Sequence, residues 1–353
     1  MELGVYSFGD VQIDPATGGL GATAQATRNL LEAIQLADQV GLDYFGIGEH
    51  HTHEMPASAA TVILGAAAST TKKIKLGSAV TVLSTDDPVR VYQQFATLDA
   101  VSNGRAEITA GRGSSTESFP LFGHSLRDYD ELYAEKLDLL LQINDNPRVT
   151  WEGRFRAALD DALVVPRPDE GKLPIWLATG GNPQSSVRAG MLGLPISYAI
   201  IGGQADRFAP LADLYRKAGA HSGIAADQLK VSVASPGYVG ADSQQAKDFF
   251  WTHWHRTMEQ LGKIRGFAPP PRWSYDREVE GTGALFAGGP EEIAERIVKL
   301  HGVLGNMRQF FQTDVGQMPH KDFLRSIELL GTRVKPLVDA ELARQGKKER
   351  IDA

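Results

Sequence analysis

A triplet of polar residues, Glu49-His50-His51, directly follows a short apolar segment at residues 44–48. A run of that kind is typical of a buried strand. An imidazole at a strand end can act as a general base or as a neutral hydrogen-bond donor near neutral pH, and a neighbouring carboxylate can fix its tautomer. Because His53 lies close by, a metal site is one alternative, and a structural histidine that caps a loop is another. The triplet is the first candidate for proton transfer.

Two further segments combine glycine with groups that bind anions. Gly111-Arg112-Gly113 follows a strand predicted at residues 106–110. Its glycines let the backbone approach a ligand, and its guanidinium offers a planar fork for phosphate oxygens. Thr179-Gly180-Gly181-Asn182-Pro183 follows the next predicted strand and opens a helix, with exposed N–H groups and a positive dipole end. Each segment alone is also typical of an ordinary turn, but together they indicate a phosphate-bearing cofactor.

One glycine motif is in the wrong place for a phosphate. Residues 19–24 fit the G-x-G-x-x-A pattern of a dinucleotide fold, but ten residues separate them from the first predicted strand. The pattern needs its glycine turn directly after the strand, because only then does the pyrophosphate lie over the strand end. A dinucleotide fold is therefore not expected.

These segments need a scaffold that brings several strand ends together. Strand-like runs alternate with helical segments along the chain, and the predicted strands are residues 3–8, 44–48, 74–82, 105–110, 175–178, 195–200, 230–235 and 308–313. Alternating βα units imply a parallel sheet, and eight of them favour an α/β fold of the closed (β/α)8 TIM barrel type over an open doubly wound sheet. Active sites of such barrels lie at the carboxyl ends of the strands, where all three segments fall.

Two segments interrupt the alternation. Residues 144–173 predict a hairpin-like insertion, and residues 265–289, with three consecutive prolines and several glycines, predict a long loop before the last βα unit. A loop of that length in a barrel is commonly functional or disordered. We expect residues 1–345 to form a single domain and residues 346–353 to form a polar tail.

Composition narrows the classes of function. The 353 residues include 36 Lys and Arg against 43 Asp and Glu, a formal charge of -7 without a basic tract, so nucleic acid is not an expected partner. The chain has no cysteine, which excludes disulfides, thiolate nucleophiles and Cys-based metal sites. Its start lacks the pattern of a signal peptide and its longest uncharged runs are too short to span a membrane, so we expect a cytoplasmic protein without membrane contact.

Short motifs spread over nearly the whole chain form a specific combination. They are Glu49-His50-His51, residues 76–90, residues 99–105 running into Gly111-Arg112-Gly113, residues 174–181, residues 289–292 and residues 333–336. Together they resemble the bacterial luciferase family of flavin-dependent monooxygenases.

That resemblance implies a barrel that binds reduced FMN, delivered by a separate flavin reductase. Reaction with O2 would give a C4a-hydroperoxide that oxidises a small organic substrate such as an aldehyde, so the flavin would carry the hard chemistry. A homodimer is expected as well. Residues 265–289 correspond to the mobile loop of that family, which we expect to be a lid over the site. A deazaflavin-dependent oxidoreductase of the same fold, a flavin-binding protein without turnover and a metal-dependent barrel hydrolase remain as alternatives.

The resemblance also assigns roles to residues. His50 matches the catalytic histidine, Arg112 matches the residue that holds the FMN phosphate, and Ala79-Val80 matches a non-proline cis peptide beneath the flavin ring. Gly180-Gly181 matches a phosphate-contacting loop. Relatives can carry a Glu-Ser pair at that loop, so this chain should contact phosphate more through backbone N–H groups, with Ser185 as a further candidate; no metal ligand is expected.

Overall fold

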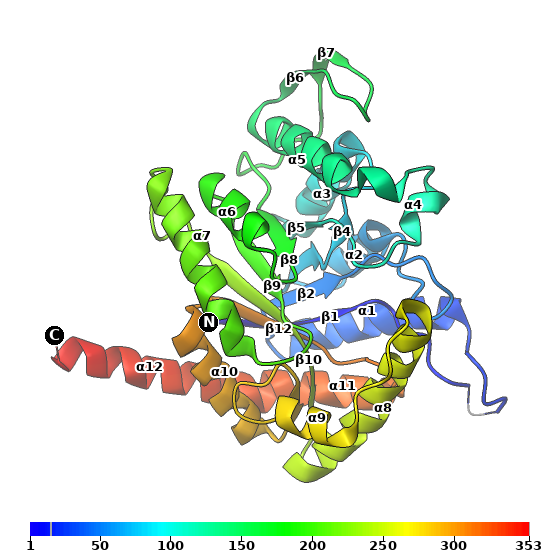
Figure 1. The fold of residues 1–353 in the computed structure, drawn as a ribbon, viewed down its shortest axis with the longest axis vertical. Helices are drawn as coiled ribbons and strands as arrows, with labels where there is room; N and C mark the ends of the chain where they lie inside the picture. The colour runs from blue at the N-terminus through cyan, green and yellow to red at the C-terminus, as the bar shows by residue number, and fades with distance from the viewer. Residues whose placement is uncertain (15, 353) are drawn as a thin grey trace.

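A closed ring of parallel strands forms the centre of the computed structural model, which describes residues 1–14 and 16–352 (Figure 1). Around the ring the strands are β1 (Glu2–Ser7), β2 (Tyr44–Ile47), β3 (Lys75–Ser78), β5 (Ala106–Gly111), β8 (Ile175–Thr179), β9 (Ile196–Ala199), β10 (Val231–Val239) and β12 (Arg308–Gln312). The ring closes because β12 pairs with both β10 and β1. The predicted (β/α)8 TIM barrel is confirmed, and each of the eight predicted strands contributes to it.

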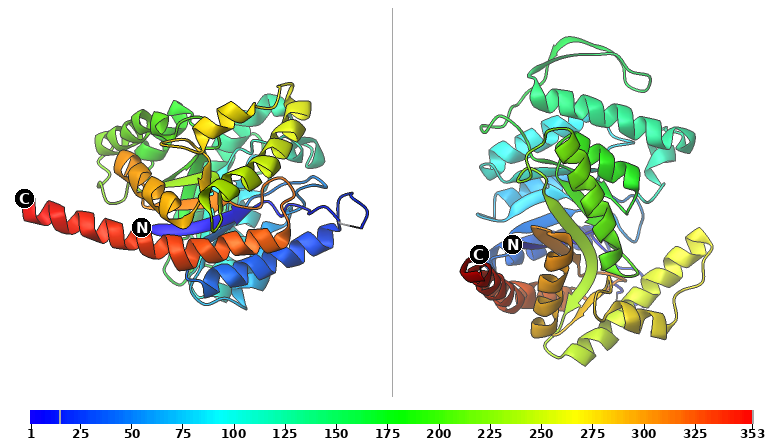
Figure 2. Two further views of the ribbon diagram at one scale, coloured as in Figure 1. Left: turned by 90° about the horizontal axis from the view of Figure 1, so that it is seen from below. Right: turned by 60° about the vertical axis from the view of Figure 1, so that its left-hand side comes forward.

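Helices cover the outside of the ring (Figures 1 and 2). The longer ones are α1 (Thr23–Gln39), α2 (Ala60–Ala68), α3 (Pro88–Ser102), α5 (Tyr129–Asp145), α6 (Pro183–Met191), α7 (Ala209–His221), α8 (Ser243–Arg265), α10 (Pro290–Leu304), α11 (His320–Leu329) and α12 (Lys335–Asp352). The short ones are α4 (Ser118–Leu121), α9 (Arg272–Glu278), η1 (Leu126–Asp128), η2 (Ala205–Phe208) and η3 (Leu330–Val334). Val5 and Ile108 of the strands and Ile34 and Leu137 of the helices are fully buried, so the main apolar core lies between ring and helices.

The two predicted insertions contain secondary structure. Strands β6 (Arg148–Trp151) and β7 (Leu159–Leu163) pair antiparallel, which confirms the hairpin. The segment at residues 265–289 contains α9 and a short strand, β11 (Phe286–Gly288), that adds to β10. The sequence analysis did not predict α9, which is anchored by the buried Tyr275.

The end of the chain continues as helix. α12 extends away from the barrel as far as Asp352, so it includes most of the polar tail predicted at residues 346–353 (Figure 2). Ala353 lies outside the described residues. The division of the chain into one domain and a tail stays a prediction.

A buried ion-pair network fills the amino end of the barrel. Arg308 of β12 donates two hydrogen bonds to Glu107 of β5, at 2.6 and 3.0 Å, and one to Glu2 of β1 at 2.6 Å. Lys75 of β3 lies 2.6 Å from Glu2 and 3.4 Å from Glu107. The Arg308 guanidinium also lies 4.5 Å from the ring centre of Tyr44. Two acids and two bases balance, so no buried charge is left without a partner.

This network gives the first testable prediction. Arg308→Met should lower the free energy of unfolding by about 3–5 kcal/mol, because Glu107 would stay buried without its two hydrogen bonds from Arg308 and with only the more distant Lys75 as a partner. The double variant Arg308→Met/Glu107→Leu removes both charges and should regain most of that loss. Urea unfolding followed by circular dichroism measures both. A loss below about 1 kcal/mol for the single variant would contradict this account of the amino end.

Candidate active site

The carboxyl ends of the barrel strands form a mouth whose inner wall has small side chains. Trp176 of β8 faces the barrel interior, because it stacks on the Arg308 guanidinium at 4.8 Å. Alternation along the strand turns Ala178 to the same side, and Ala199 of β9 faces inward opposite the outward-facing Tyr198. Ala178 and Ala199 are half-buried although both lie on barrel strands. Solvent therefore reaches the barrel interior at this end.

The chain crosses the mouth between β3 and the short strand β4 (Thr81–Val82). We call residues 79–82 the rim segment. The peptide between Ala79 and Val80 is cis, which confirms that prediction. A Cβ atom at Gly111 of β5 would lie 2.5 Å from the Val80 side chain, so glycine is what lets Val80 lie against β5. The half-buried Ala79 and Val80 thus form an accessible surface at the mouth.

His50 lies beside the rim segment and pairs with a carboxylate. Its side chain is buried, and Nδ1 lies 2.9 Å from Oε1 of Glu117. Burial alone would raise the pKa of Glu117, but the hydrogen bonds from His50 and from backbone N–H groups lower that pKa below its ordinary value. An ionised Glu117 accepts a hydrogen bond from the Nδ1–H group, which leaves Nε2 as the ring nitrogen that can take a proton from a ligand. The ring of Phe8 lies 4.4 Å from the His50 ring and shields it from water.

The second histidine of the triplet has a different partner. Nε2 of His51 lies 2.9 Å from Oε1 of Glu49, and Oε2 of Glu49 accepts a hydrogen bond from the Val82 N–H at 2.9 Å. Burial raises the pKa of Glu49. Within residues 1–14 and 16–352, no group of three or more His, Asp or Glu side chains could hold a metal ion.

Arg112 lies at the end of β5 and has polar partners on both arms of its guanidinium. Nη2 donates to Oγ of Ser185 at 2.5 Å, and Nη1 donates to Asp130 at 2.8 Å. The Asp130 side chain is 80% exposed. A surface ion pair of that kind adds little stability, so Asp130 can give way to an external anion. The Asp130 carboxylate therefore marks where a phosphate would fit.

The glycine turn supplies fewer free N–H groups than expected. Gly181 has a φ of +109°, and its N–H and that of Asn182 donate to Oγ1 of Thr179 at 3.3 and 3.2 Å. Gly180 is exposed, with no heavy atom within 4 Å of a Cβ built on it. The turn leaves open space at Gly180, and the Arg112 and Ser185 side chains are better placed than the turn N–H groups to donate hydrogen bonds to an anion. That set and the open turn fit a flavin phosphate.

The predicted residues come together as one arc along the mouth. His50 and Arg112 do not touch, but the rim segment joins them, because Val80 accepts a hydrogen bond from the Glu49 N–H at 3.1 Å and lies against Gly111. Glu117 and Asp130 were missed. Glu117 lies five residues after Arg112 in the same strand-end loop, and that position could have identified it as a candidate site residue.

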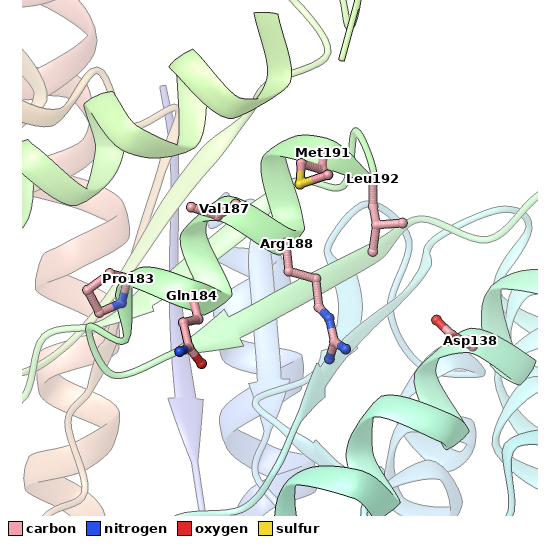
Figure 3. Close-up of a pocket in the computed structure, with 7 residues that line it drawn as sticks. All are labelled: Asp138, Pro183, Gln184, Val187, Arg188, Met191 and Leu192. Carbon is pink, nitrogen blue, oxygen red and sulfur yellow. The ribbon is translucent and has the colours of Figure 1, made fainter. Parts of the chain in front are cut away.

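A groove of about 480 Å³ lies between α5 and α6, outside the ring (Figure 3). Its lining consists of Asp138, Pro183, Gln184, Val187, Arg188, Met191 and Leu192. His50, Arg112 and Ser185 are not among these residues. The groove is therefore separate from the mouth.

Two buried carboxyl groups lie behind the ends of β1 and β12. Asp10 and Asp314 border a cavity of about 10 Å³, and Oγ of Ser7 donates to Asp314. In the described part of the chain, one oxygen of each carboxyl has no hydrogen-bond partner. Burial, followed by repulsion from Asp314, raises the pKa of Asp10 well above its usual value, and burial raises the pKa of Asp314 to about 6. Ser7 alternates with the inward-facing Tyr6, so this pair faces the helices rather than the mouth.

Comparison with known sequences gives a family and a partial relative that is named for its cofactor. A model described as luciferase-like monooxygenase matches residues 1–306. A luciferase-like monooxygenase of Escherichia coli K12 is 26% identical over 341 residues, covering 92% of this chain and 95% of that protein. An F420-dependent glucose-6-phosphate dehydrogenase of Beutenbergia cavernae is 36% identical over 177 residues, 48% of this chain and 51% of that protein.

Solved structures share the fold. Monooxygenase RslO1 of Streptomyces bottropensis superposes with a TM-score of 0.82 at 22% identity, over 95% of this chain and 99% of that one. The oxygenating constituent of 3,6-diketocamphane monooxygenase of Pseudomonas putida, in complex with FMN, has a TM-score of 0.73 at 19% identity, over 95% and 98%. Among the described residues, no helix has both the length and the apolarity to cross a membrane.

The buried carboxyl pair predicts a pH dependence of stability. With its pKa at about 6, Asp314 binds a proton more tightly in the native state than in the unfolded chain, where an Asp pKa is near 3.9. Stability is therefore lost as the pH rises from about 4 through 6. Asp314→Asn cannot ionise, so relative to the unaltered protein it should gain roughly 2–3 kcal/mol between pH 4 and pH 7.5.

Urea unfolding at both pH values measures that gain. Asp227→Asn, at an exposed position, serves as the control and should show no such change. A constant difference between Asp314→Asn and the unaltered protein across this pH range would contradict the assignment.

Proposed function

Because the chain belongs to the luciferase-like monooxygenase family, we propose that it is a flavin-dependent monooxygenase that uses reduced FMN and O2 to oxidise a small organic substrate such as an aldehyde. One observation carries the proposal. The His50–Glu117 pair, the rim segment and the Arg112–Ser185 pair lie along a single arc of the barrel mouth. In that order, these groups would supply a base for the reaction, a surface for the flavin ring and a binding site for the FMN phosphate.

The phosphate end of the proposal rests on Arg112 and Ser185. The guanidinium would turn its two arms from Asp130 and Ser185 towards phosphate oxygens, and the Ser185 hydroxyl would donate a further hydrogen bond. The open space at Gly180 would leave room for the phosphate beside the start of α6. Ala79 and Val80 would lie under the flavin ring.

The reactive end rests on His50. Nε2 would take a proton from substrate, while Glu117 holds the ring in the required tautomer and stabilises the charge that forms. Phe8 would keep water from this side of the mouth. The bound reduced flavin supplies the electrons that activate O2.

Partners and surroundings are further parts of the proposal. Reduced flavin would come from a separate flavin reductase, and the chain would act as a homodimer in the cytoplasm. A second candidate is a deazaflavin-dependent oxidoreductase, favoured by the partial relative named as F420-dependent.

Anaerobic titration of the protein with reduced FMN and, separately, with reduced F420 tests the proposed cofactor. We expect FMN to bind at least tenfold more tightly. Tighter binding of F420 would support the deazaflavin candidate instead, and binding of neither cofactor would contradict the proposed function.

A phosphate-specific variant tests the anion site. Arg112→Ala should weaken FMN binding at least tenfold, which corresponds to about 1.4 kcal/mol, because the phosphate loses a charge-assisted contact. Riboflavin has no phosphate, so its affinity should not change. Fluorescence titration measures both ligands. Equal loss for the two would show that Arg112 does not bind the phosphate.

The role of His50 is tested by turnover and binding together. His50→Ala should lower kcat at least a hundredfold, the usual contribution of a general base, and leave the dissociation constant of FMN within about threefold. His53→Ala removes a nearby exposed histidine and should leave both values unchanged. Steady-state assays with substrates found by an aldehyde screen give the rates. Full activity of His50→Ala would rule out this base.

A further inference from the structure

Glu49 holds the rim segment from two sides. Its backbone N–H donates to the Val80 carbonyl at 3.1 Å, and its side-chain Oε2 accepts from the Val82 N–H at 2.9 Å. These two contacts are made to the second and the last residues of the rim segment. A buried backbone N–H without a partner is costly, so loss of the carboxylate would leave the Val82 N–H without this acceptor and weaken the hold on the rim segment.

The Glu49 carboxylate is itself held in place. Oε1 pairs with Nε2 of His51 at 2.9 Å, and both side chains are about nine-tenths buried. The His51 ring in turn lies 5.2 Å from the ring of Phe122. Both carboxylate oxygens already have protein donors, and the Glu49 side chain is only 11% exposed, so little of the carboxylate is accessible to a substrate. Its contacts suit positioning rather than proton transfer.

The last two residues of the rim segment form β4, which pairs with β5, whereas Ala79 and Val80 lie outside that pairing. Ala79 and Val80 are half-buried at the mouth, and the Ala79 N–H donates to the Ile47 carbonyl at 2.8 Å. On the other side Val80 rests against Gly111, which has no side chain. The carboxylate of Glu49 is therefore the side chain that ties this segment to the loop bearing His50.

We propose that Glu49 is a positioning residue that, with His51 behind it, fixes the rim segment as the surface against which the flavin ring lies. This inference rests on the proposed function. Cofactor recognition would then have two separate parts. Arg112 and Ser185 would bind the phosphate, whereas Glu49 would determine the affinity for the flavin ring, equally in FMN and in riboflavin, which has no phosphate.

Binding of a phosphate-free flavin tests this separation. Glu49→Ala should weaken riboflavin and FMN binding by the same factor, at least tenfold, and should change the absorption spectrum of bound oxidised flavin. Glu49→Gln keeps an oxygen that can accept from the Val82 N–H and an amide that can donate to His51, so it should restore both affinities to within about threefold. Fluorescence titration at 15 °C measures the affinities.

A matched control separates positioning from general stability. Asp38 also accepts backbone N–H groups, from Lys72, Lys73 and Ile74 at 2.8–2.9 Å, but before β3 at the amino end of the barrel. Asp38→Ala should lower Tm and leave riboflavin affinity and the flavin spectrum unchanged. If Glu49→Ala does not fold, Glu49→Asp, whose carboxylate is one methylene further from Val82, should show the same losses.

The outcomes are distinguishable. Unchanged riboflavin affinity and spectrum in Glu49→Ala, or in Glu49→Asp, would overturn the inference and leave the proposed function standing. Loss of FMN affinity alone would also overturn it, because Glu49 would then act on the phosphate. Absence of any flavin binding by the unaltered protein would overturn the proposed function and this inference with it.

Discussion

Closure of the strand ring is the constraint on which the rest of the structure depends. β12 must pair with β1 on one side and with β10 on the other, and the parallel direction of all eight strands then sends every carboxyl end to the same mouth. His50, Arg112 and Ser185 come from three separate βα units. They meet around one opening because the ring is closed, since an open sheet would spread their strand ends along a line.

The two ends of the barrel use charge in different ways. At the amino end, Arg308 and Lys75 neutralise Glu2 and Glu107, so the interior there is closed and its charges have partners. At the mouth the inward-facing residues of β8 and β9 are alanines, Ala178 and Ala199, and the charged groups belong to the loops around the opening. Under the proposed function, these small side chains would leave space for a planar ring, and the loop residues would supply the base and the anion site.

Much of this arrangement was predictable from sequence. Strand and helix alternation has a strong periodic signal, and the short motifs fixed which strand ends carry His50 and Arg112. The pairing of His50 with Glu117 was not predictable, because the two residues are 67 positions apart and meet only through the conformation of the loop after β5. Helix α9 was missed because prolines and glycines surround it. Its anchor, Tyr275, donates a hydrogen bond to α8, and no local sequence pattern reveals that contact.

Rapid mixing tests the central claim most directly. The protein, loaded anaerobically with reduced FMN, is mixed with oxygenated buffer while the flavin absorbance is followed. The account predicts a long-lived absorbance transient distinct from both reduced and oxidised FMN, whose decay changes when a substrate aldehyde is present. Reoxidation of bound FMN at the rate of the free cofactor, with no transient, would contradict oxygenase function and favour a flavin-binding protein without turnover.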